Sequence, residues 1–266
     1  MTQNIRIGIL ISGSGTNMDA IIRACEEEKI NGNIVFVGSD NPDAKGLEKA
    51  AQKAIPTFVV NYSNIIREFK LNPSITTLPA DFDLEEIRIK QSFFTDAADS
   101  EKVIHFLCTR AIAEARILEY MKPYSVDLLA LAGFMRNLTP YFIDRVNTET
   151  GKPRIMNIHP ALLPCFPGTD GYGDTFRHGC KVGGCTVHFI DYGEDSGPII
   201  GQRSFAIEET DTIESIKKKG LSLEWELYPE CIRLFAQDRL HTVKMTHKLD
   251  SGKIMQRTVV KIAQTE

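Results

Sequence analysis

The sequence predicts an α/β protein with a Rossmann-like, mostly parallel sheet flanked by helices. Short runs of Ile, Val and Leu without polar alternation recur along the chain, a pattern typical of strands buried on both faces. Segments with helical periodicity lie between those runs, and turns rich in glycine, serine and proline separate them. Because strand–helix–strand alternation favours right-handed crossovers, the strands are expected to pair in parallel.

The first sixty residues alternate regularly. Ile5–Ile11 is a β-branched run that ends at a Gly/Ser-rich turn, and an amphipathic helix is expected after it, over 18–29. A strand, a helix and a strand are then expected at 33–38, 46–53 and 56–60. Residues 61–102 break this rhythm, with one short helix expected at 83–90. They are interpreted as an ordered, irregular surface insertion whose role the pattern does not define.

The second half of the chain resumes the pattern. Its expected strands are 126–132, 154–156, 185–190 and 198–206. Its expected helices are 101–122, 138–146 and 213–237. Two further short strands around Asp250-Ser251-Gly252 predict a C-terminal hairpin over about 240–266. No repeat, low-complexity tract or linker interrupts the chain, so a single domain spanning 1–266 is expected.

The composition is that of an ordinary globular protein. The 266 residues carry a net charge of −4, which argues against a nucleic-acid-binding surface. Six dispersed cysteines form no CxxC pair and indicate reduced thiols, and His178 near Cys180 and Cys185 fits no standard metal spacing. No stretch approaches the ~18 apolar residues of a membrane span. We therefore expect a cytoplasmic protein that needs no metal.

The most specific chemical pattern lies where the expected strand at 154–156 ends. Asn157 and His159 are two residues apart, so they share a face of an extended chain, at the strand end where α/β sheets bind ligands. Asn offers a neutral donor for a developing oxyanion, and His transfers protons near neutral pH. Asp195, in a glycine turn, is a candidate to orient the imidazole. The alternatives are a hydrogen-bonded loop histidine and a structural Asx-turn.

His188 and Cys165 are each interpreted as having no catalytic role. His188 lies within an expected strand and is interpreted as a hydrogen-bonded, partly buried histidine. Cys165 has no identifiable base that would make it a nucleophile. The segment Phe134-Met135-Arg136 follows a buried strand and is either core plus a surface arginine or the wall of a pocket.

The turn Ser12-Gly13-Ser14-Gly15-Thr16-Asn17 has the composition of a phosphate-binding loop. It joins a strand to a helix N-terminus, where glycines let the backbone approach an anion and unpaired N–H groups and the helix dipole favour it. The turn matches neither GxGxxG nor a Walker sequence, so a nucleoside triphosphate is not implied. A plain tight turn is the alternative.

Four motifs then occur in a defined order. They are Ile11-Ser12-Gly13-Ser14-Gly15-Thr16-Asn17, Leu131-Ala132-Gly133-Phe134-Met135-Arg136, Asn157-Ile158-His159-Pro160-Ala161-Leu162-Leu163-Pro164 and Asp195-Ser196-Gly197-Pro198-Ile199-Ile200. With them the sequence resembles the phosphoribosylglycinamide formyltransferase family over most of 5–240, excluding roughly 61–105. The resemblance implies a Rossmann-like formyltransferase fold. It also implies formyl transfer from 10-formyltetrahydrofolate to the amine of glycinamide ribonucleotide in de novo purine biosynthesis, without a metal.

The resemblance also implies roles for individual residues. Asn157 would stabilise the oxyanion, His159 would transfer the proton, and Asp195 would hold the imidazole and raise its pKa by opposite charge. The residues expected to contact the ribonucleotide are Gly15, Thr16 and Asn17, at its phosphate, and Glu224. Those expected to line the folate site are Arg110, Met135, Arg136, Asn137, Leu138, Asp191 and Glu194.

Some positions depart from the family pattern. Residues 169–176 replace a helix-forming stretch that usually carries a histidine, and Trp225 stands where the family commonly has histidine. These departures leave open an amino-sugar nucleotide or methionyl-tRNA as acceptor, hydrolysis of the formylfolate, and folate binding without turnover. The tRNA enzyme and the hydrolase would each need a further domain, and a non-enzyme would lack the Asn, His or Asp. We expect small-molecule partners only, and a monomer or homodimer.

Overall fold

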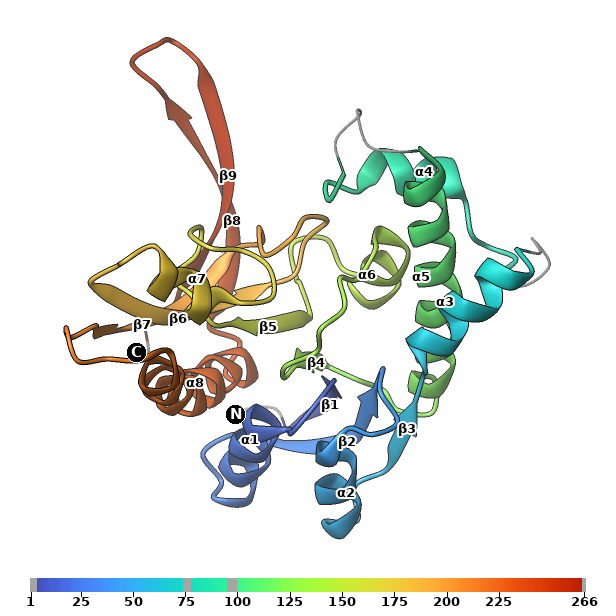
Figure 1. Ribbon diagram of the computed structural model, residues 1–266, viewed down its shortest axis with the longest axis horizontal. Coiled ribbons are helices and arrows are strands. Elements are labelled where there is room, and N and C mark those ends of the chain that lie inside the picture. Colours follow the sequence, from blue (N-terminus) through green and yellow to red (C-terminus); the bar gives the residue numbers. More distant parts are fainter. Residues whose placement is uncertain (1–3, 74–77, 95–99, 265–266) are drawn as a thin grey trace.

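The computed structural model describes residues 4–73, 78–94 and 100–264. Within these ranges a seven-stranded sheet has the order β3-β2-β1-β4-β5-β6-β7 (Figure 1). Its strands are β1 (Ile5–Ile11), β2 (Gly32–Ser39), β3 (Thr57–Val59), β4 (Leu128–Leu131), β5 (Ile155–His159), β6 (Val182–Phe189) and β7 (Ile199–Ala206). Pairing is parallel from β3 to β5 and antiparallel at β5–β6 and β6–β7. The predicted mostly parallel sheet is confirmed.

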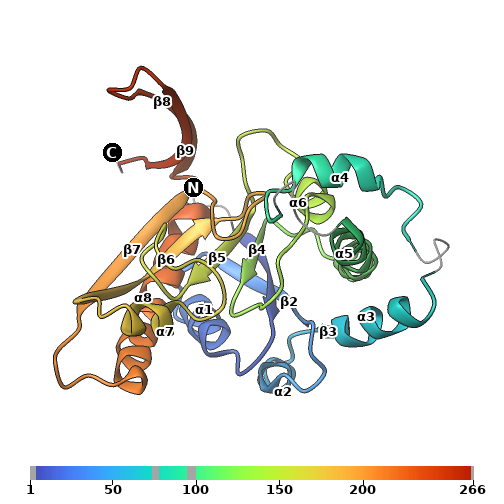
Figure 2. The ribbon, with the colours of Figure 1, turned by 45° about the horizontal axis from the view of Figure 1, so that its top comes forward.

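Helices cover both faces of this sheet (Figure 2). They are α1 (Thr16–Glu26), α2 (Lys45–Gln52), α3 (Tyr62–Leu71), α4 (Leu84–Lys90), α5 (Ser100–Met121), α6 (Pro140–Val146), α7 (Gly171–Arg177) and α8 (Ile213–Ala236). Helices α1, α2 and α8 pack on one face, and α3, α5 and α6 pack on the other. No helix in the described ranges has the length and apolar character needed to cross a membrane.

The uninterrupted apolar runs are explained by burial on both faces. Ile7 and Ile9 of β1 point into the core formed with α1 and α8, whereas Leu10 points into the core formed with α5 and α6. On β4, Leu129 and Leu131 join Leu10 while the alternate residues face the first core. Successive side chains of a strand point to opposite faces, so β1 and β4 carry apolar residues on both sides.

The insertion is more regular than we expected. The short helix expected at 83–90 is confirmed as α4, and the Asp83 side chain caps it by accepting from the Glu86 N–H at 3.0 Å. The expectation of irregular chain directly after β3 was wrong, because α3 forms there with an Asn61 cap that accepts from the Asn64 N–H. Asparagine is a favoured helix N-cap, so this signal was present in the sequence.

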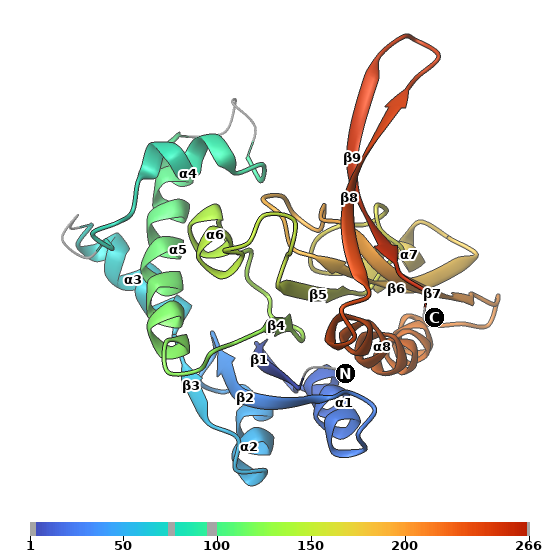
Figure 3. The same cartoon turned by 180° about the vertical axis from the view of Figure 1, so that it is seen from behind.

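The chain ends in the predicted hairpin. Strands β8 (Leu240–Lys248) and β9 (Ile254–Ile262) pair antiparallel and are longer than the sequence pattern indicated. Figure 3 shows the hairpin extending away from the sheet, beside the end of α8. Residues 265–266 of the expected hairpin segment lie outside the described ranges.

Candidate active site

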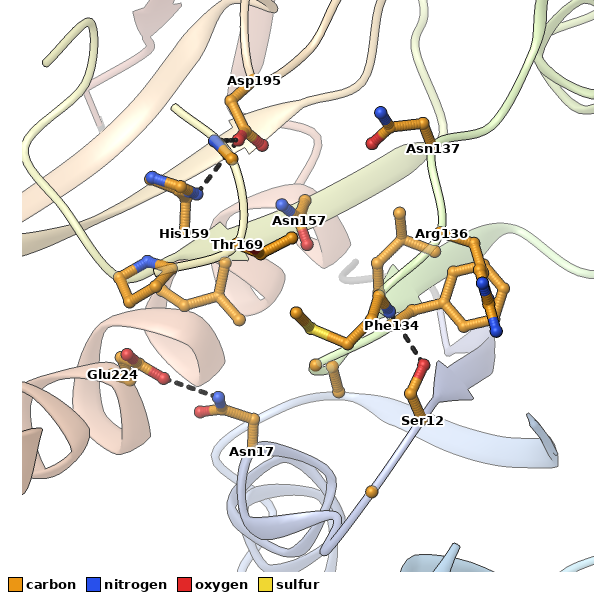
Figure 4. A pocket seen from close by; sticks show the side chains of 18 of the residues that line it. Ser12, Asn17, Phe134, Arg136, Asn137, Asn157, His159, Thr169, Asp195 and Glu224 are labelled. Atoms are coloured by element: carbon orange, nitrogen blue, oxygen red, sulfur yellow. Dashed lines mark hydrogen bonds and ion pairs between the residues drawn. The ribbon is translucent and has the colours of Figure 1, made fainter. Parts of the chain in front are cut away.

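A cavity of ≈ 470 Å³ opens beyond the carboxyl ends of β1, β4 and β5 (Figure 4). The strand order reverses here, since β2 and β3 continue to one side of β1 while β4 lies on its other side. Open α/β sheets bind ligands at such a crevice. The predicted site residues that line it are Gly15, Thr16, Asn17, Met135, Arg136, Asn137, Leu138, Asn157, His159, Glu194, Asp195 and Glu224.

Asn157 and His159 lie side by side on β5 and both line the cavity, as their spacing predicted. The antiparallel neighbour β6 places His188 opposite Asn157. The two side chains meet, with Asn157 Nδ2 3.3 Å from His188 Nε2. Because an asparagine amide carries two N–H donors, this contact leaves one of them free for a ligand oxygen.

Asp195 reaches the imidazole from the loop between β6 and β7. Its Oδ2 lies 3.2 Å from His159 Nδ1 and accepts a hydrogen bond from the Gly168 N–H at 2.8 Å. Its Oδ1 lies 3.6 Å from His188 Nε2. The backbone of Asp195 is left-handed, with φ 48°, a conformation that Asp tolerates better than most residues. The structure therefore places the predicted orienting carboxylate against both histidines.

His159 is buried between two acceptors. Its Nε2 lies 2.8 Å from the Phe166 carbonyl oxygen, while Nδ1 faces Asp195. Burial holds the pKa of His159 below its ordinary value, although the charge of Asp195 and the Phe166 carbonyl both act to raise it. The raising effect that the resemblance implies for Asp195 is therefore present, but burial outweighs it and the net pKa is lowered.

The carboxylate of Asp195 remains ionised in this environment. Burial acts to raise the pKa of Asp195, but the contact with His188, the charge of His159 and the Gly168 N–H together hold it below its ordinary value. An ionised Asp195 can fix the ring orientation of His159 and stabilise a positive charge that develops on it.

His188 contacts both Asn157 and Asp195, which our interpretation from the sequence did not anticipate. It is fully buried, and its Nδ1 lies 2.9 Å from the Phe189 carbonyl oxygen while Nε2 faces Asn157 and Asp195. Its burial agrees with the simpler interpretation, but its neighbours place it behind the Asn–His–Asp cluster. Only the register between β5 and β6 could have revealed this, and that register is set by long-range pairing.

The loop between β1 and α1 forms one end of the cavity. Gly15, with φ 71°, turns the chain into α1, so the first N–H groups of that helix are left without intrahelical acceptors. Ser12 fixes the loop to the β4 side of the cavity, because its Oγ accepts from the Met135 N–H at 2.8 Å and its N–H donates to Gly133. This is a suitable geometry for an anion such as a phosphate.

Glu224 approaches the same end from α8. Its carboxylate accepts from Asn17 Nδ2 at 2.7 Å and from the Tyr172 hydroxyl at 2.6 Å. Burial raises the pKa of Glu224, and these two hydrogen bonds oppose that effect. Tyr172 belongs to α7, a helix that forms from the divergent stretch 169–176, and Gly220 makes room for its ring. The divergent stretch therefore supports Glu224 directly.

Two predicted folate-site residues do not line the cavity. The buried Arg110 stacks over Tyr62 and Phe106, with its guanidinium carbon 5.0 and 4.6 Å from the ring centroids. Asp191 shapes the turn before Asp195, since its Oδ1 accepts from the Gly193 N–H and the Ser196 hydroxyl. Arg110 is therefore a buried core residue, and Asp191 acts on the shape of the loop that carries Asp195.

The other predicted arginine does line the cavity. Arg136 pairs with the buried Asp40 at 2.5 Å, with its guanidinium 5.3 Å from the Tyr62 ring centroid. Its positive charge is therefore already partnered. No cluster of three or more potential metal ligands occurs among the described residues, and all six cysteines are free.

The α/β fold thus brings a side-chain amide, a buried histidine beside a carboxylate and a loop with the geometry of an anion site into one cavity. The sequence profile of the formyl transferase family matches residues 5–232, and the chain belongs to that family. It is an enzyme of the one-carbon, formyl-transferring class, as the four motifs indicated.

Relatives and solved structures agree with this assignment. The phosphoribosylglycinamide formyltransferase of Bacillus subtilis (strain 168) is 32% identical over 228 residues, which cover 86% of this chain and 93% of that protein. Glycinamide ribonucleotide transformylase 1 from Symbiobacterium toebii is 34% identical, with a TM-score of 0.68 over 98% of this chain and 95% of its own. The phosphoribosylglycinamide formyltransferase of Anaplasma phagocytophilum is 29% identical, with a TM-score of 0.66 over 95% and 93%.

Proposed function

We propose that this enzyme transfers the formyl group of 10-formyltetrahydrofolate to the amine of glycinamide ribonucleotide, in de novo purine biosynthesis. The observation that carries the proposal is the presence of an anion-binding loop and an Asn–His–Asp cluster in one cavity. An acceptor with a phosphate at one end and a nucleophilic amine at the other matches this arrangement. The names of the relatives support the same acceptor.

In the proposed reaction the amine attacks the formyl carbon, and the formyl oxygen becomes an oxyanion. The free N–H of Asn157 donates to that oxygen. His159 is neutral near pH 7 because burial lowers its pKa, and its Nδ1–H donates to Asp195. Its Nε2 lone pair accepts the proton that the amine loses, and the protonated Nε2 can then donate to the Phe166 carbonyl oxygen. The proton then passes to the departing folate nitrogen, and Asp195 stabilises the imidazolium in between. The products are formylated acceptor and tetrahydrofolate.

A comparison of acceptors tests the proposal. We expect rapid turnover with glycinamide ribonucleotide, and a large loss in kcat/KM with the dephosphorylated riboside, because the loop at 12–17 loses its anion. Equal kcat/KM for the riboside would contradict a role for that loop. Preferred use of an amino-sugar nucleotide, or folate turnover without any acceptor, would replace the proposed acceptor with another amine or with water.

Lys217 provides a sharper test of the phosphate end. It lies on the cavity-facing side of α8 with Leu221 and Glu224, and its Nζ is 3.9 Å from Asp170 Oδ1. We expect Lys217→Ala to raise the acceptor KM about tenfold, since a hydrogen bond to a charged group contributes about 1.5 kcal/mol. The kcat and the donor KM should stay unchanged.

Lys218 supplies the matched control for this prediction. It is exposed and adjacent on α8, but it does not line the cavity. Lys218→Ala should therefore leave the acceptor KM near the wild-type value. A similar rise of the acceptor KM in both variants would show that general surface charge, rather than a contact between Lys217 and the phosphate, causes the rise.

The pH dependence of kcat should report His159. Because the neutral ring accepts the proton, kcat is expected to rise with pH through a pKa below the ordinary histidine value. Asp195→Asn removes the charge that opposes burial, so the pKa of His159 falls further and this acid limb moves to lower pH. The plateau of kcat should fall about 100-fold, because the ring loses its ionised partner. An acid limb that moves to higher pH would contradict the assigned interaction.

A further inference from the structure

Among the described residues of the insertion, Phe93 lies in the cavity wall. Phe93 lines the cavity together with residues that follow β4 and β6. The four motifs shared with the formyltransferase family lie outside this segment, although the family profile spans it, so none of the residue roles that the resemblance implies falls on Phe93.

The segment after α4 is fastened to the loop that carries Asp195. The Ser92 N–H donates to the Tyr192 carbonyl at 2.9 Å, and Gly193 leaves room for this approach, since a Cβ there would come within 3.0 Å of Ser92 Oγ. Lys90 pairs with Asp144 at 2.9 Å, and the same carboxylate accepts a hydrogen bond from the Tyr192 hydroxyl. The insertion is thus attached at two points beside the catalytic cluster.

The turn that follows Gln91 places the rings of the adjacent Phe93 and Phe94 in different surroundings. The Gln91 side chain accepts from the N–H groups of both Phe93 and Phe94, at 2.8 and 3.0 Å. The Phe94 ring packs edge-on against Phe106 of α5 with centroids 5.2 Å apart, and it does not line the cavity. The Phe93 ring is farther from Phe106, at 6.4 Å, and does line the cavity.

The contacts around Phe93 show which end of the cavity its ring lines. Its neighbour Ser92 contacts Tyr192 and Gly193, and Glu194 follows them in the same loop. Glu194 accepts from Asn137 Nδ2 at 3.3 Å, so this wall is continuous with the loop after β4. The phosphate end, formed by the loop after β1 and by Glu224, is built from different elements.

We propose that Phe93 is a specificity-determining contact for the formyl donor, and that the insertion contributes a wall to the donor half of the site. Its ring offers an apolar face or edge to the flat aromatic groups of a reduced folate. Tyr192, Gly193 and the Lys90–Asp144 pair hold that ring in place. This inference rests on the proposed function only in naming the donor as a reduced folate.

The test compares four proteins: the wild type, Phe93→Ala, Phe93→Tyr and Phe94→Ala. The binding of tetrahydrofolate to each is measured by calorimetry without acceptor, and the KM values for donor and acceptor are measured in turnover. We expect Phe93→Ala to weaken tetrahydrofolate binding and to raise the donor KM by about three- to tenfold. The acceptor KM should be unchanged, and Phe93→Tyr should restore donor binding.

Phe94→Ala is the matched control, because it removes a ring from the same turn without altering the cavity lining. It is expected to lower the melting temperature and to leave the donor KM near the wild-type value. An unchanged donor affinity in Phe93→Ala, or an equal loss in Phe94→Ala, would overturn the inference. A wild type that binds tetrahydrofolate but does not formylate glycinamide ribonucleotide would overturn the proposed acceptor alone, and a wild type that does not bind tetrahydrofolate would overturn both.

Discussion

Replacement of His159 by alanine is expected to lower kcat by about 10²- to 10⁴-fold, the usual contribution of a positioned proton-transfer group. The imidazole lies 3.2 Å from Asp195 and next to Asn157 in the cavity, and no other described histidine lines it. Because His159 acts on the proton rather than on binding, both KM values should change little. Steady-state kinetics near neutral pH measures all three quantities.

His241 provides the control for this experiment. It lies exposed on the C-terminal hairpin, so His241→Ala should retain full activity. Turnover of His159→Ala within about threefold of wild type would mean that another group moves the proton. Circular dichroism would confirm that both variants fold, because a buried side chain is removed in the first.

Asn157→Asp should have a similarly large effect. The substitution nearly preserves the shape of the side chain, but it places a negative charge where the oxyanion develops, close to Asp195. Loss of one oxyanion donor lowers kcat by about 10²- to 10³-fold, and the added repulsion should increase that loss. Asn157→Ala removes the donor without adding charge, so it should be the more active of the two variants.

The ranking of these two variants tests the assignment. If Asn157 only supports His188 through their 3.3 Å contact, both variants should lose stability and affinity together with activity. If Asn157 stabilises the oxyanion, tetrahydrofolate should still bind to both variants with wild-type affinity while kcat falls. An Asn157→Asp enzyme more active than Asn157→Ala would contradict the assigned role.

Local sequence patterns were sufficient for most of the fold. The strands and helices that were predicted from the sequence, such as β1, β4 and α8, have strong hydrophobic periodicity or capping residues at their ends. Helix α3 was missed because it follows a short strand in a segment interpreted as irregular, although Asn61 caps it. Helix α7 was missed because Gly171 and Gly173 disfavour helix, and tertiary contacts to α8 override that propensity.

The site was predicted only where its residues are close in sequence or belong to a recognisable motif. Asn157 and His159 share a face through strand alternation, and the loop after β1 has a composition that suits an anion. Tyr172 and Phe93 reach the cavity through a helix–helix contact and the folding of the insertion, and strand register places His188 against Asn157 behind the cavity wall. Burial also decides whether the pKa of His159 lies above or below its ordinary value, and burial cannot be read from a single sequence.

The stoichiometry of the products tests the proposed reaction most directly. The purified enzyme is given 10-formyltetrahydrofolate and glycinamide ribonucleotide, and tetrahydrofolate and the formylated ribonucleotide are quantified over time, with a no-acceptor control. We expect the two products to appear at equal rates and almost no tetrahydrofolate to form in the control. Tetrahydrofolate produced without formylated ribonucleotide would contradict the proposed reaction and would identify water as the acceptor.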